Sequence, residues 1–361
     1  MFRTQAVVSM ENRESILAAM LDHIEEHVTV ERTDAGAHIA SPFGTVDIMR
    51  RDDDVLVDVA SDSTEVLGMM RIFVAEHIFE FAGESASVVW SGDGVDTMLP
   101  PHFQKLTVAS VSDVTPRMRR VILSCENVAA CASDSRHHIR LLLPPAGRAP
   151  RWPTISTDGR IRWPTDDDAL VTRIYTIRSI DTDAGRIAVD FVLHDHAGPA
   201  SAWAASVQPG TVIGMLGPGG SAVPPAGRYL LAGDETALPA ISRLLESLPA
   251  QARGLALIEV ADAAEEQKID NRTAIEVRWL HRKGAVPGTT TLLQDAIMAL
   301  PEPGRDDDLF VWASCEFSAF KAIRVHVRKR WGLAKEKHLV TSYWRLGMAN
   351  EDAEVLEPDD A

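Results

Sequence analysis

The sequence predicts a multidomain protein, with a small α+β domain followed by an antiparallel β-barrel and then a parallel-sheet α/β domain. The chain of 361 residues is too long for one ordinary hydrophobic core. Short strand-like segments broken by Gly, Pro and Asp fill its middle, and strand and helix patterns alternate after Arg228. We therefore expect domains at 1–95, 102–227 and 228–347, followed by an acidic tail at 348–361.

The first 95 residues combine the periodicities of helices and strands. Residues 14–28 and 63–82 have the apolar spacing of helices, while the stretch between them alternates like strands and 87–90 closes the unit. This segment holds 6 Arg, no Lys and 18 Asp or Glu, a net charge of −12 in a chain of net charge −16. An acidic unit before a neutral body predicts separate partners. Nucleic acid is not expected, because no basic segment is interleaved with aromatic residues.

Composition also bears on location and metal content. No stretch approaches the roughly 18–20 consecutive apolar residues of a membrane span, and the first residues show no export signal. Cys125, Cys131 and Cys315 match no metal-ligand spacing, so we expect reduced thiols in a cytoplasmic protein. His23 and His27 lie one helical turn apart and can ligate a metal with a third partner. No carboxylate or cysteine pattern completes such a site, so we predict no metal.

The central strand 173–178 has the pattern Arg-x-Tyr-Thr-x-Arg. The ring of Tyr175 can stack on a flat heterocycle, and Thr176 can hydrogen-bond a ring edge. Arg173 or Arg178 can bind a phosphate through its forked guanidinium. The same pattern also fits an antiparallel strand whose arginines face water.

A second candidate segment begins a helix some twenty residues later. Gly198, Ala200 and Ser201 can present backbone N–H groups at the positive end of this helix, which is a suitable pyrophosphate site. His194 can add a donor. The alternative is an ordinary helix started by Pro199. Taken with the preceding strand, the segment predicts one dinucleotide bound across both elements.

The region 102–347 resembles the siderophore-interacting proteins, which are flavin-dependent ferric-siderophore reductases of the ferredoxin-reductase superfamily. The first 95 residues resemble a small domain of unknown function that accompanies such reductases. The resemblance implies a flavin-binding barrel and a nucleotide-binding α/β domain. It is carried, in order, by the motifs RIYTIR (173–178), DFVLHDHAGPASAWA (190–204), LLAGDETALPAI (230–241) and SYWRLG (342–347).

The resemblance implies FAD in the barrel, with its ring system against Tyr175 and Thr176 and its phosphates near Arg173 and the 198–201 helix start. It further assigns four residues to the cofactor region: Asp234, Thr236, Glu316 and Trp344. The residues themselves leave simpler roles open, because Thr236 also suits a helix cap and Trp344 also suits a core.

Two departures from the family pattern concern the electron donor. The turn after the strand at 229–233 carries Asp234 and Glu235 in place of a glycine-rich phosphate loop, and these acids repel a pyrophosphate. Cys315 stands where such reductases have a glycine, and we favour a buried apolar thiol there. NADPH or NADH is the expected donor, and a ferredoxin-like donor protein remains the alternative.

Many ferric siderophores are anionic, so their site is expected to be positive. Residues 321–338 hold seven Lys or Arg against one Glu, although a charge run on a helix is usually its solvated face. The predicted substrate-binding residues are Arg282, Lys335, Lys337 and Arg345.

The predicted reaction passes electrons from a reduced nicotinamide through FAD to Fe(III) in a siderophore, releasing Fe(II). The organic chemistry belongs to the cofactor, so no catalytic side chain is expected. Two alternatives remain at this stage: a general flavin or ferredoxin-type NAD(P)H reductase, and a non-enzymatic iron-chelate binding protein.

Overall fold

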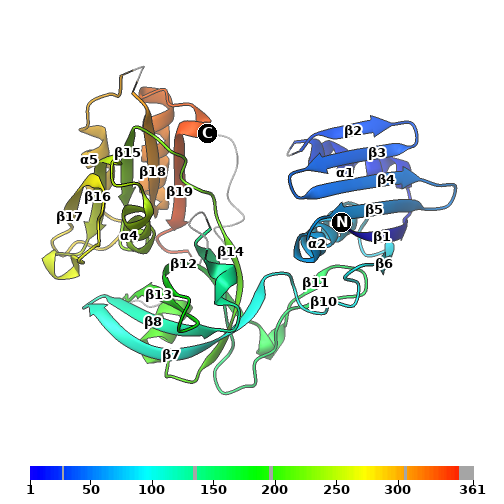
Figure 1. Ribbon diagram of the computed structural model, residues 1–361, viewed down its shortest axis with the longest axis horizontal. Coiled ribbons are helices and arrows are strands. Elements are labelled where there is room, and N and C mark those ends of the chain that lie inside the picture. Colours follow the sequence, from blue (N-terminus) through cyan, green and yellow to red (C-terminus); the bar gives the residue numbers. More distant parts are fainter. Residues whose placement is uncertain (27, 133–135, 195–197, 305–306, 349–361) are drawn as a thin grey trace. The chain divides into compact units, whose positions relative to one another are not determined.

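The structure is a computed structural model that divides by its internal packing into two compact units (Figure 1). Unit 1 consists of residues 1–103 and 144–170, and unit 2 of 104–143 and 171–361. The segment 144–170 thus packs with the first unit, although it interrupts the sequence of the barrel. The structure describes every residue except 27, 133–135, 195–197, 305–306 and 349–361, so nearly all of the predicted tail lies outside it.

Unit 1 contains the α+β fold expected for residues 1–95, together with the 144–170 segment that the sequence had assigned to the barrel. Its six-stranded antiparallel sheet has the order β2-β3-β4-β5-β1-β6. The strands are β1 (Phe2–Ser9), β2 (Val30–Thr33), β3 (Gly36–Ser41), β4 (Gly44–Arg50), β5 (Val55–Ser61) and β6 (Ser87–Gly92). The two helices are α1 (Arg13–Glu25) and α2 (Thr64–Ala82), close to the predicted ranges.

Alternation along the strands decides which face of this sheet is covered. Ala6 and Val8 of β1 are buried while their neighbours are exposed, because successive side chains point to opposite faces. The buried face shares one core with Leu21 of α1 and Ile78 of α2. Ser63 caps the start of α2, since its hydroxyl accepts the Val66 N–H at 3.4 Å.

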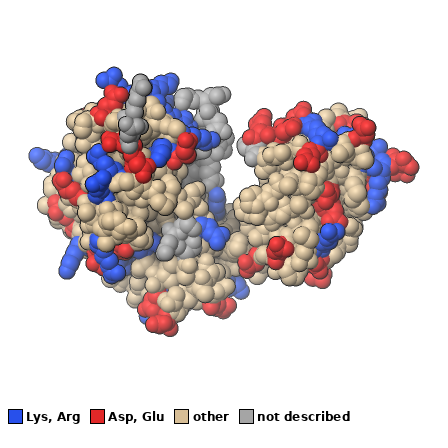
Figure 2. Space-filling view, turned by 45° about the horizontal axis from the view of Figure 1, so that its top comes forward, with Lys and Arg blue, Asp and Glu red and all other residues tan. Residues whose placement is uncertain are grey.

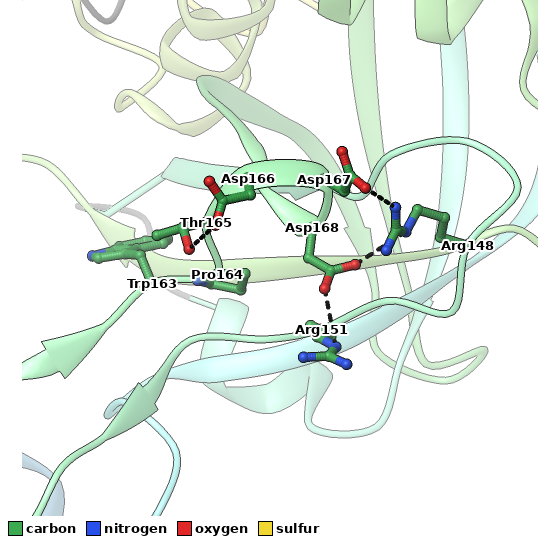
Figure 3. Close-up of a pocket in the computed structure, with 8 residues that line it drawn as sticks. All are labelled: Arg148, Arg151, Trp163, Pro164, Thr165, Asp166, Asp167 and Asp168. Atoms are coloured by element: carbon green, nitrogen blue, oxygen red, sulfur yellow. Dashed lines mark hydrogen bonds and ion pairs between the residues drawn. The ribbon is translucent and has the colours of Figure 1, made fainter.

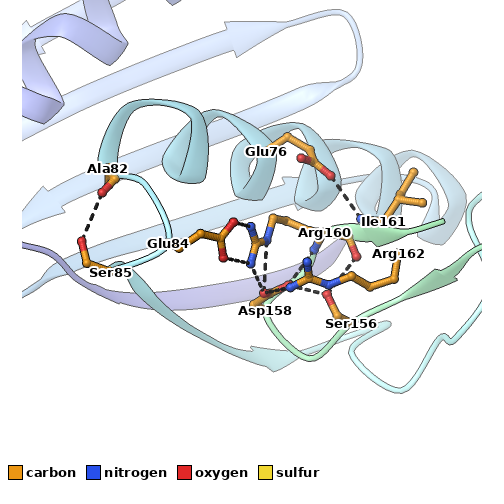
Figure 4. A network of polar contacts seen from close by, with 9 residues as sticks. All are labelled: Glu76, Ala82, Glu84, Ser85, Ser156, Asp158, Arg160, Ile161 and Arg162. Carbon is orange, nitrogen blue, oxygen red and sulfur yellow. Dashed lines mark hydrogen bonds and ion pairs between the residues drawn. The ribbon is translucent and has the colours of Figure 1, made fainter. Parts of the chain in front are cut away.

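A short hairpin of β10 (Thr154–Ile155) and β11 (Ile161–Arg162) fastens the 144–170 segment to the rest of unit 1 (Figure 4). Arg160 donates to both carboxylate oxygens of Glu84, at 2.6 and 3.1 Å, and lies 3.5 Å from the centre of the Phe79 ring. Gly159 has φ 94°, and a Cβ there would lie 2.5 Å from an indole nitrogen of unit 1. Because only glycine fits this approach, the hairpin is shaped to its partner.

Unit 2 begins with the predicted antiparallel barrel, closed in the order β12-β13-β8-β7-β14-β9. Its strands are β7 (Phe103–Thr115), β8 (Met118–Cys125), β9 (His138–Leu143), β12 (Val171–Asp181), β13 (Arg186–Val192) and β14 (Val212–Gly219). The interior is filled by apolar side chains, including Leu123, Leu141 and Phe191. Helix α3 (Pro199–Ser206) packs against this core through Ala200 and Ala204.

The α/β domain follows with a parallel sheet of order β17-β16-β15-β18-β19. Helix α4 (Leu238–Ser247) covers one face, and α5 (Leu292–Met298) and α6 (Phe317–Val325) cover the other. This confirms the predicted fold class. The strands are β15 (Arg228–Gly233), β16 (Arg253–Val260), β17 (Ala274–His281), β18 (Leu309–Glu316) and β19 (His338–Trp344).

The strand order reverses at β15, whose neighbours β16 and β18 extend the sheet in opposite directions. In open parallel sheets this switch point, at the carboxyl ends of the strands, is where ligands bind. The fold alone therefore indicates that a ligand site lies at the carboxyl-end edge of the parallel sheet. Among the described residues, no helix is both long enough and apolar enough to cross a membrane.

Candidate functional site

A cavity of about 1650 Å³ lies in unit 2, lined by the barrel and by the carboxyl-end edge of the parallel sheet. This volume exceeds the roughly 300–1,000 Å³ of a pocket for one small ligand. Each strand of the sheet supplies a lining residue just beyond its carboxyl end: Thr236, Ala261, Arg282, Phe317 and Arg345. The switch point of the sheet is therefore open to the barrel.

The predicted strand lies on the barrel side of the cavity. Arg173, Tyr175 and Thr176 of β12 all line it. The Tyr175 ring packs against Phe191 with centroids 4.3 Å apart, which fixes its plane. Arg178 lies elsewhere, because its guanidinium binds both carboxylate oxygens of Glu246 at 2.9 and 2.7 Å and does not line the cavity.

The start of α3 lines the same cavity through Gly198, Ala200 and Ser201, together with His194. The first N–H groups of a helix have no partner within it, so this end is electropositive. A Cβ at Gly198 would meet no atom within 4 Å, so the helix end is open at this point. Ser201 also stabilises the chain that leads into α3, since its hydroxyl accepts the His194 N–H at 3.3 Å.

Asp234 is buried and does not line the cavity. One carboxylate oxygen accepts the N–H and hydroxyl of Thr236, at 2.9 and 2.5 Å. The other accepts the Glu316 N–H at 3.1 Å and the Trp344 indole N–H at 2.8 Å. Burial, with Glu235 beside it, still raises the pKa of this carboxyl. Asp234 thus joins the carboxyl ends of three strands and positions Trp344, which does line the cavity.

Arg282 is held in a buried ion cluster rather than offered to a ligand. Its side chain is 2% exposed and binds both oxygens of Glu235, one at 2.8 Å, with Glu259 at 3.4 Å. Burial disfavours its charge, but the two carboxylates outweigh burial and raise its pKa. Glu235 of the acidic turn after β15 is therefore paired internally, whereas Asp234 is held by neutral donors. The repulsion expected from Glu235 toward a pyrophosphate is correspondingly reduced.

Trp344 is set between the sheet and a tight turn. Gly288 has φ 76°, and a Cβ there would lie 2.8 Å from the indole ring and 3.0 Å from Glu316. Glu316 itself is buried, does not line the cavity, and accepts the N–H groups of Ser318 and Leu346 at 2.5 and 3.1 Å. Of the four residues assigned to the cofactor region, Thr236 and Trp344 line the cavity. Asp234 and Glu316 instead accept hydrogen bonds from the backbone and side chains around it.

Cations and aromatic rings share one wall of the cavity. Lys321, Arg324 and Arg345 line it with Phe317 and Phe320 of α6. The Arg345 guanidinium lies 4.5 Å from the Phe317 ring, and that of Arg324 lies 5.5 Å from the Phe320 ring. The Arg324 Nε is buried with no hydrogen-bond partner among the described residues. We call Lys321, Arg324 and Arg345 the cationic wall.

The cationic wall differs in part from the predicted substrate residues. Arg345 is common to both, whereas Lys335 and Lys337 do not line the cavity, and Lys337 binds Asp308 at 2.6 Å. Residues Lys321 and Arg324 come from the helix that the sequence suggested was mainly solvated. Across its whole lining the cavity has seven Lys or Arg and two Asp. This local excess of positive charge suits an anionic ligand despite the acidic chain.

Several lining residues have no signal in the sequence motifs. Arg117 and Arg140 reach the cavity from β-barrel segments that read as ordinary strands. The His138 imidazole meets the Tyr343 hydroxyl at 2.7 Å across 205 positions of sequence, so only the folded chain reveals the pair. Burial lowers the pKa of His138 to about 4 and keeps the ring neutral.

The three thiols behave as the sequence suggests. Cys125, Cys131 and Cys315 are all free and buried. Burial raises the pKa of Cys315, so this residue is an inert apolar side chain beside the site.

A second hollow, in unit 1, has a different character (Figure 3). Arg148 binds Asp167 at 2.9 Å and Asp168 at 3.1 Å, and Arg151 binds Asp168 at 3.1 Å. The volume is about 430 Å³ and the charges satisfy one another. Figure 2 shows acidic and basic side chains together on the visible surface of each unit. The large cavity of unit 2 is the stronger candidate site.

Comparison with known protein families divides the chain into an N-terminal domain, a barrel and an α/β domain, as the fold does. Residues 107–222 match the siderophore-interacting FAD-binding domain, and 226–347 match the siderophore-interacting protein model. Residues 5–91 match an uncharacterized protein family conserved in bacteria, DUF2218. The two models that carry a description of function thus cover the barrel and the α/β domain that line the cavity.

Individual relatives agree. The chain is 31% identical over 245 residues to the ferric vibriobactin reductase ViuB of Vibrio cholerae, covering 66% of this chain and 88% of ViuB. A siderophore utilization protein from T. fusca has 39% identity and a TM-score of 0.59, covering 69% of this chain and 94% of that one. The siderophore-interacting protein SipS from Aeromonas hydrophila has 30% identity and a TM-score of 0.60, with coverages of 70% and 96%. The chain therefore belongs to the siderophore-interacting protein family.

Proposed function

We propose that this protein is an FAD-dependent reductase that takes electrons from NADPH or NADH and reduces ferric siderophores, releasing Fe(II). One observation carries the proposal. A single cavity is lined by the Arg173–Thr176 strand, by the α3 start and by the cationic wall. The named activity of the relative ViuB, a ferric vibriobactin reductase, supports the same substrate class.

The residues present fit FAD. Tyr175 offers a ring held in place by Phe191, and Thr176 adds a hydroxyl beside it. Arg173 and the open helix end at Gly198 offer a guanidinium and backbone N–H groups, the donor set that phosphates require. Held by these residues, FAD would supply the redox chemistry that links a two-electron nicotinamide donor to a one-electron Fe(III) acceptor.

The chain itself positions ligands and shapes the electrostatic field. We assign the cationic wall to the anionic ferric chelate, because aromatic rings lie against its guanidinium groups and its side chains form no ion pair with an acid among the residues that the structure describes. Asp234 acts as a positioning residue through its hydrogen bond to Trp344. No nucleophile or proton-transfer pair is required of the protein for an electron transfer.

The donor is expected at the carboxyl-end edge of the sheet, near Thr236 and Trp344. Arg282 cannot distinguish NADPH from NADH by binding a 2′-phosphate, since both arms of its guanidinium are engaged by Glu235. A ferredoxin-like protein remains a competing donor. We place the reaction in the cytoplasm, where three free thiols remain reduced.

The test starts from purified protein and its flavin spectrum, with added FAD where the spectrum is weak. An anaerobic titration with NADPH, NADH and reduced ferredoxin in turn identifies the donor by bleaching of the flavin band. Ferric siderophores are then compared with generic acceptors, and Fe(II) is captured by a chromogenic chelator. Protein that takes up no FAD contradicts the proposal. Equal rates with all acceptors favour a general flavin reductase, and tight chelate binding without turnover favours a binding protein.

A further inference from the structure

The N-terminal unit contains a cluster of potential metal ligands that the reductase chemistry does not use. His23 lies near the end of α1, while His77 and Glu80 lie on α2. One ligand atom from each side chain lies within 4.8 Å of the others. An ion with bonds of about 2.1 Å in tetrahedral geometry holds its ligand atoms about 3.4 Å apart. Small side-chain rotations therefore suffice to close the set around one ion.

The fold places these side chains together for local reasons. His77 and Glu80 are three residues apart, so they project from the same face of α2. The two helices pack side by side on the sheet, which brings the His23 and His77 rings to a centroid distance of 5.6 Å. The sequence singled out His23 for a metal only with His27, which lies outside the described residues. The partners that complete the set are more than fifty positions away.

The orientation of His77 is fixed in the manner of a metal ligand. Its Nδ1 lies 2.8 Å from the carbonyl oxygen of Phe73. Because a carbonyl only accepts, Nδ1 must donate, and Nε2 then presents its lone pair. Metal-bound histidines typically have such a second hydrogen bond, which selects the tautomer and holds the ring. The ring also packs at 4.0 Å from Phe73, and His23 lies 5.6 Å from Phe81.

We propose that His23, His77 and Glu80 form a binding site for a divalent transition-metal ion. Two imidazoles and one carboxylate are ligands that suit Zn(II) and Fe(II), and they leave a position for water. Such a set is poor for Mg(II), which prefers oxygen ligands. The net charge of −12 on the first 95 residues further favours a cation. The proposal does not depend on the reductase activity, because all three ligands belong to unit 1.

Equilibrium dialysis of the full-length, flavin-loaded chain tests the site after treatment with a chelator. Zn(II), Fe(II) under anaerobic conditions, and Mg(II) are the three probes, and bound metal is counted by elemental analysis. We expect about one Zn(II) or Fe(II) per chain and no comparable Mg(II) binding. Comparing the first two probes identifies the preferred ion. Flavin content reports on unit 2 in the same samples, so failure of the metal site is separate from failure of the proposed function.

Matched variants assign the ion to these side chains. His77→Ala and Glu80→Gln are each expected to weaken binding at least tenfold, and the exposed Glu80 tolerates replacement without loss of fold. His38→Ala is the control, because His38 belongs to the same unit but pairs with Asp47 at 2.6 Å, away from the cluster's helices. Circular dichroism checks that each variant is folded. Binding that is unchanged in both ligand variants, equally lost in the control, or no tighter than that of Mg(II) overturns the proposal.

Discussion

The assignment of the cationic wall to the chelate leads to a prediction for Arg324. Replacing it with alanine removes one positive charge from the cavity and the contact with the Phe320 ring, but breaks no ion pair among the described residues. At about 7 Å from a unit negative charge, with an effective dielectric constant of about 40–80 for a half-buried site, the lost attraction is about 0.6–1.2 kcal/mol. We therefore expect KM for an anionic ferric chelate to rise about three- to eightfold per negative charge.

Steady-state reduction with a saturating nicotinamide provides the assay. KM for the chelate should rise, while kcat and the nicotinamide KM stay close to their starting values. The effect should shrink at high salt, because the Debye length falls from about 8 Å at 0.15 M to about 3 Å at 1 M. Arg324→Lys should recover most of the affinity. Lys329→Ala is the control, since Lys329 is exposed on the following helical turn and does not line the cavity.

Two results would refute this reasoning. One is an unchanged KM for Arg324→Ala with active, folded protein. The other is a larger rise in KM for Lys335→Ala than for Arg324→Ala, which would favour the sequence-based choice of chelate residues over the cavity geometry.

Three further predictions concern the frame of the site. Arg282→Ala should lower the free energy of unfolding, measured by chemical denaturation, by about 3–5 kcal/mol, because it leaves Glu235 buried and unpaired. A change below about 1 kcal/mol would argue against a tightly coupled cluster. Gly288→Ala should cost at least about 1 kcal/mol and shift the Trp344 fluorescence, since its Cβ meets the indole at a positive φ. The folded chain holds His138 at a pKa of about 4 while the unfolded chain protonates near 6.5, so acid favours unfolding. Lowering the pH from 6.5 to 5 should therefore lower the free energy of unfolding by about 1.6 kcal/mol through this group, a loss that His138→Gln should remove from the pH profile.

Much of the fold was predictable from the sequence because its signals are local. Strand alternation, helical spacing and the change of pattern after Arg228 depend on near neighbours along the chain. The Arg173–Thr176 strand and the Gly198–Ser201 turn were found in the same way, and both line one cavity. Two segments about twenty residues apart, both recognised from local patterns, therefore lie on the barrel side of the cavity.

The limits of sequence reasoning appear where a side chain has several partners to choose from. Asp234 and Arg282 have the residue types of ligand-binding groups. In the folded chain, however, Asp234 accepts a hydrogen bond from Trp344 and Arg282 forms an ion pair with Glu235. The sequence favoured Lys335 over Arg324 as a chelate ligand, although of these two residues only Arg324 lines the cavity. The sequence could not separate these cases, because exposure depends on the register of α6 and on the turn that follows it.

The sequence by itself determined the order of the domains, the family and the elements that carry the residues we assign to the dinucleotide, because each is encoded in short contiguous patterns. Only the tertiary structure decided which charges face the cavity, how the 144–170 segment joins the first unit, and that His77 and Glu80 meet His23. These outcomes rest on pairings between distant segments. The free energy of such pairings comes from burial and packing, and no local pattern specifies which partner a buried charge will find.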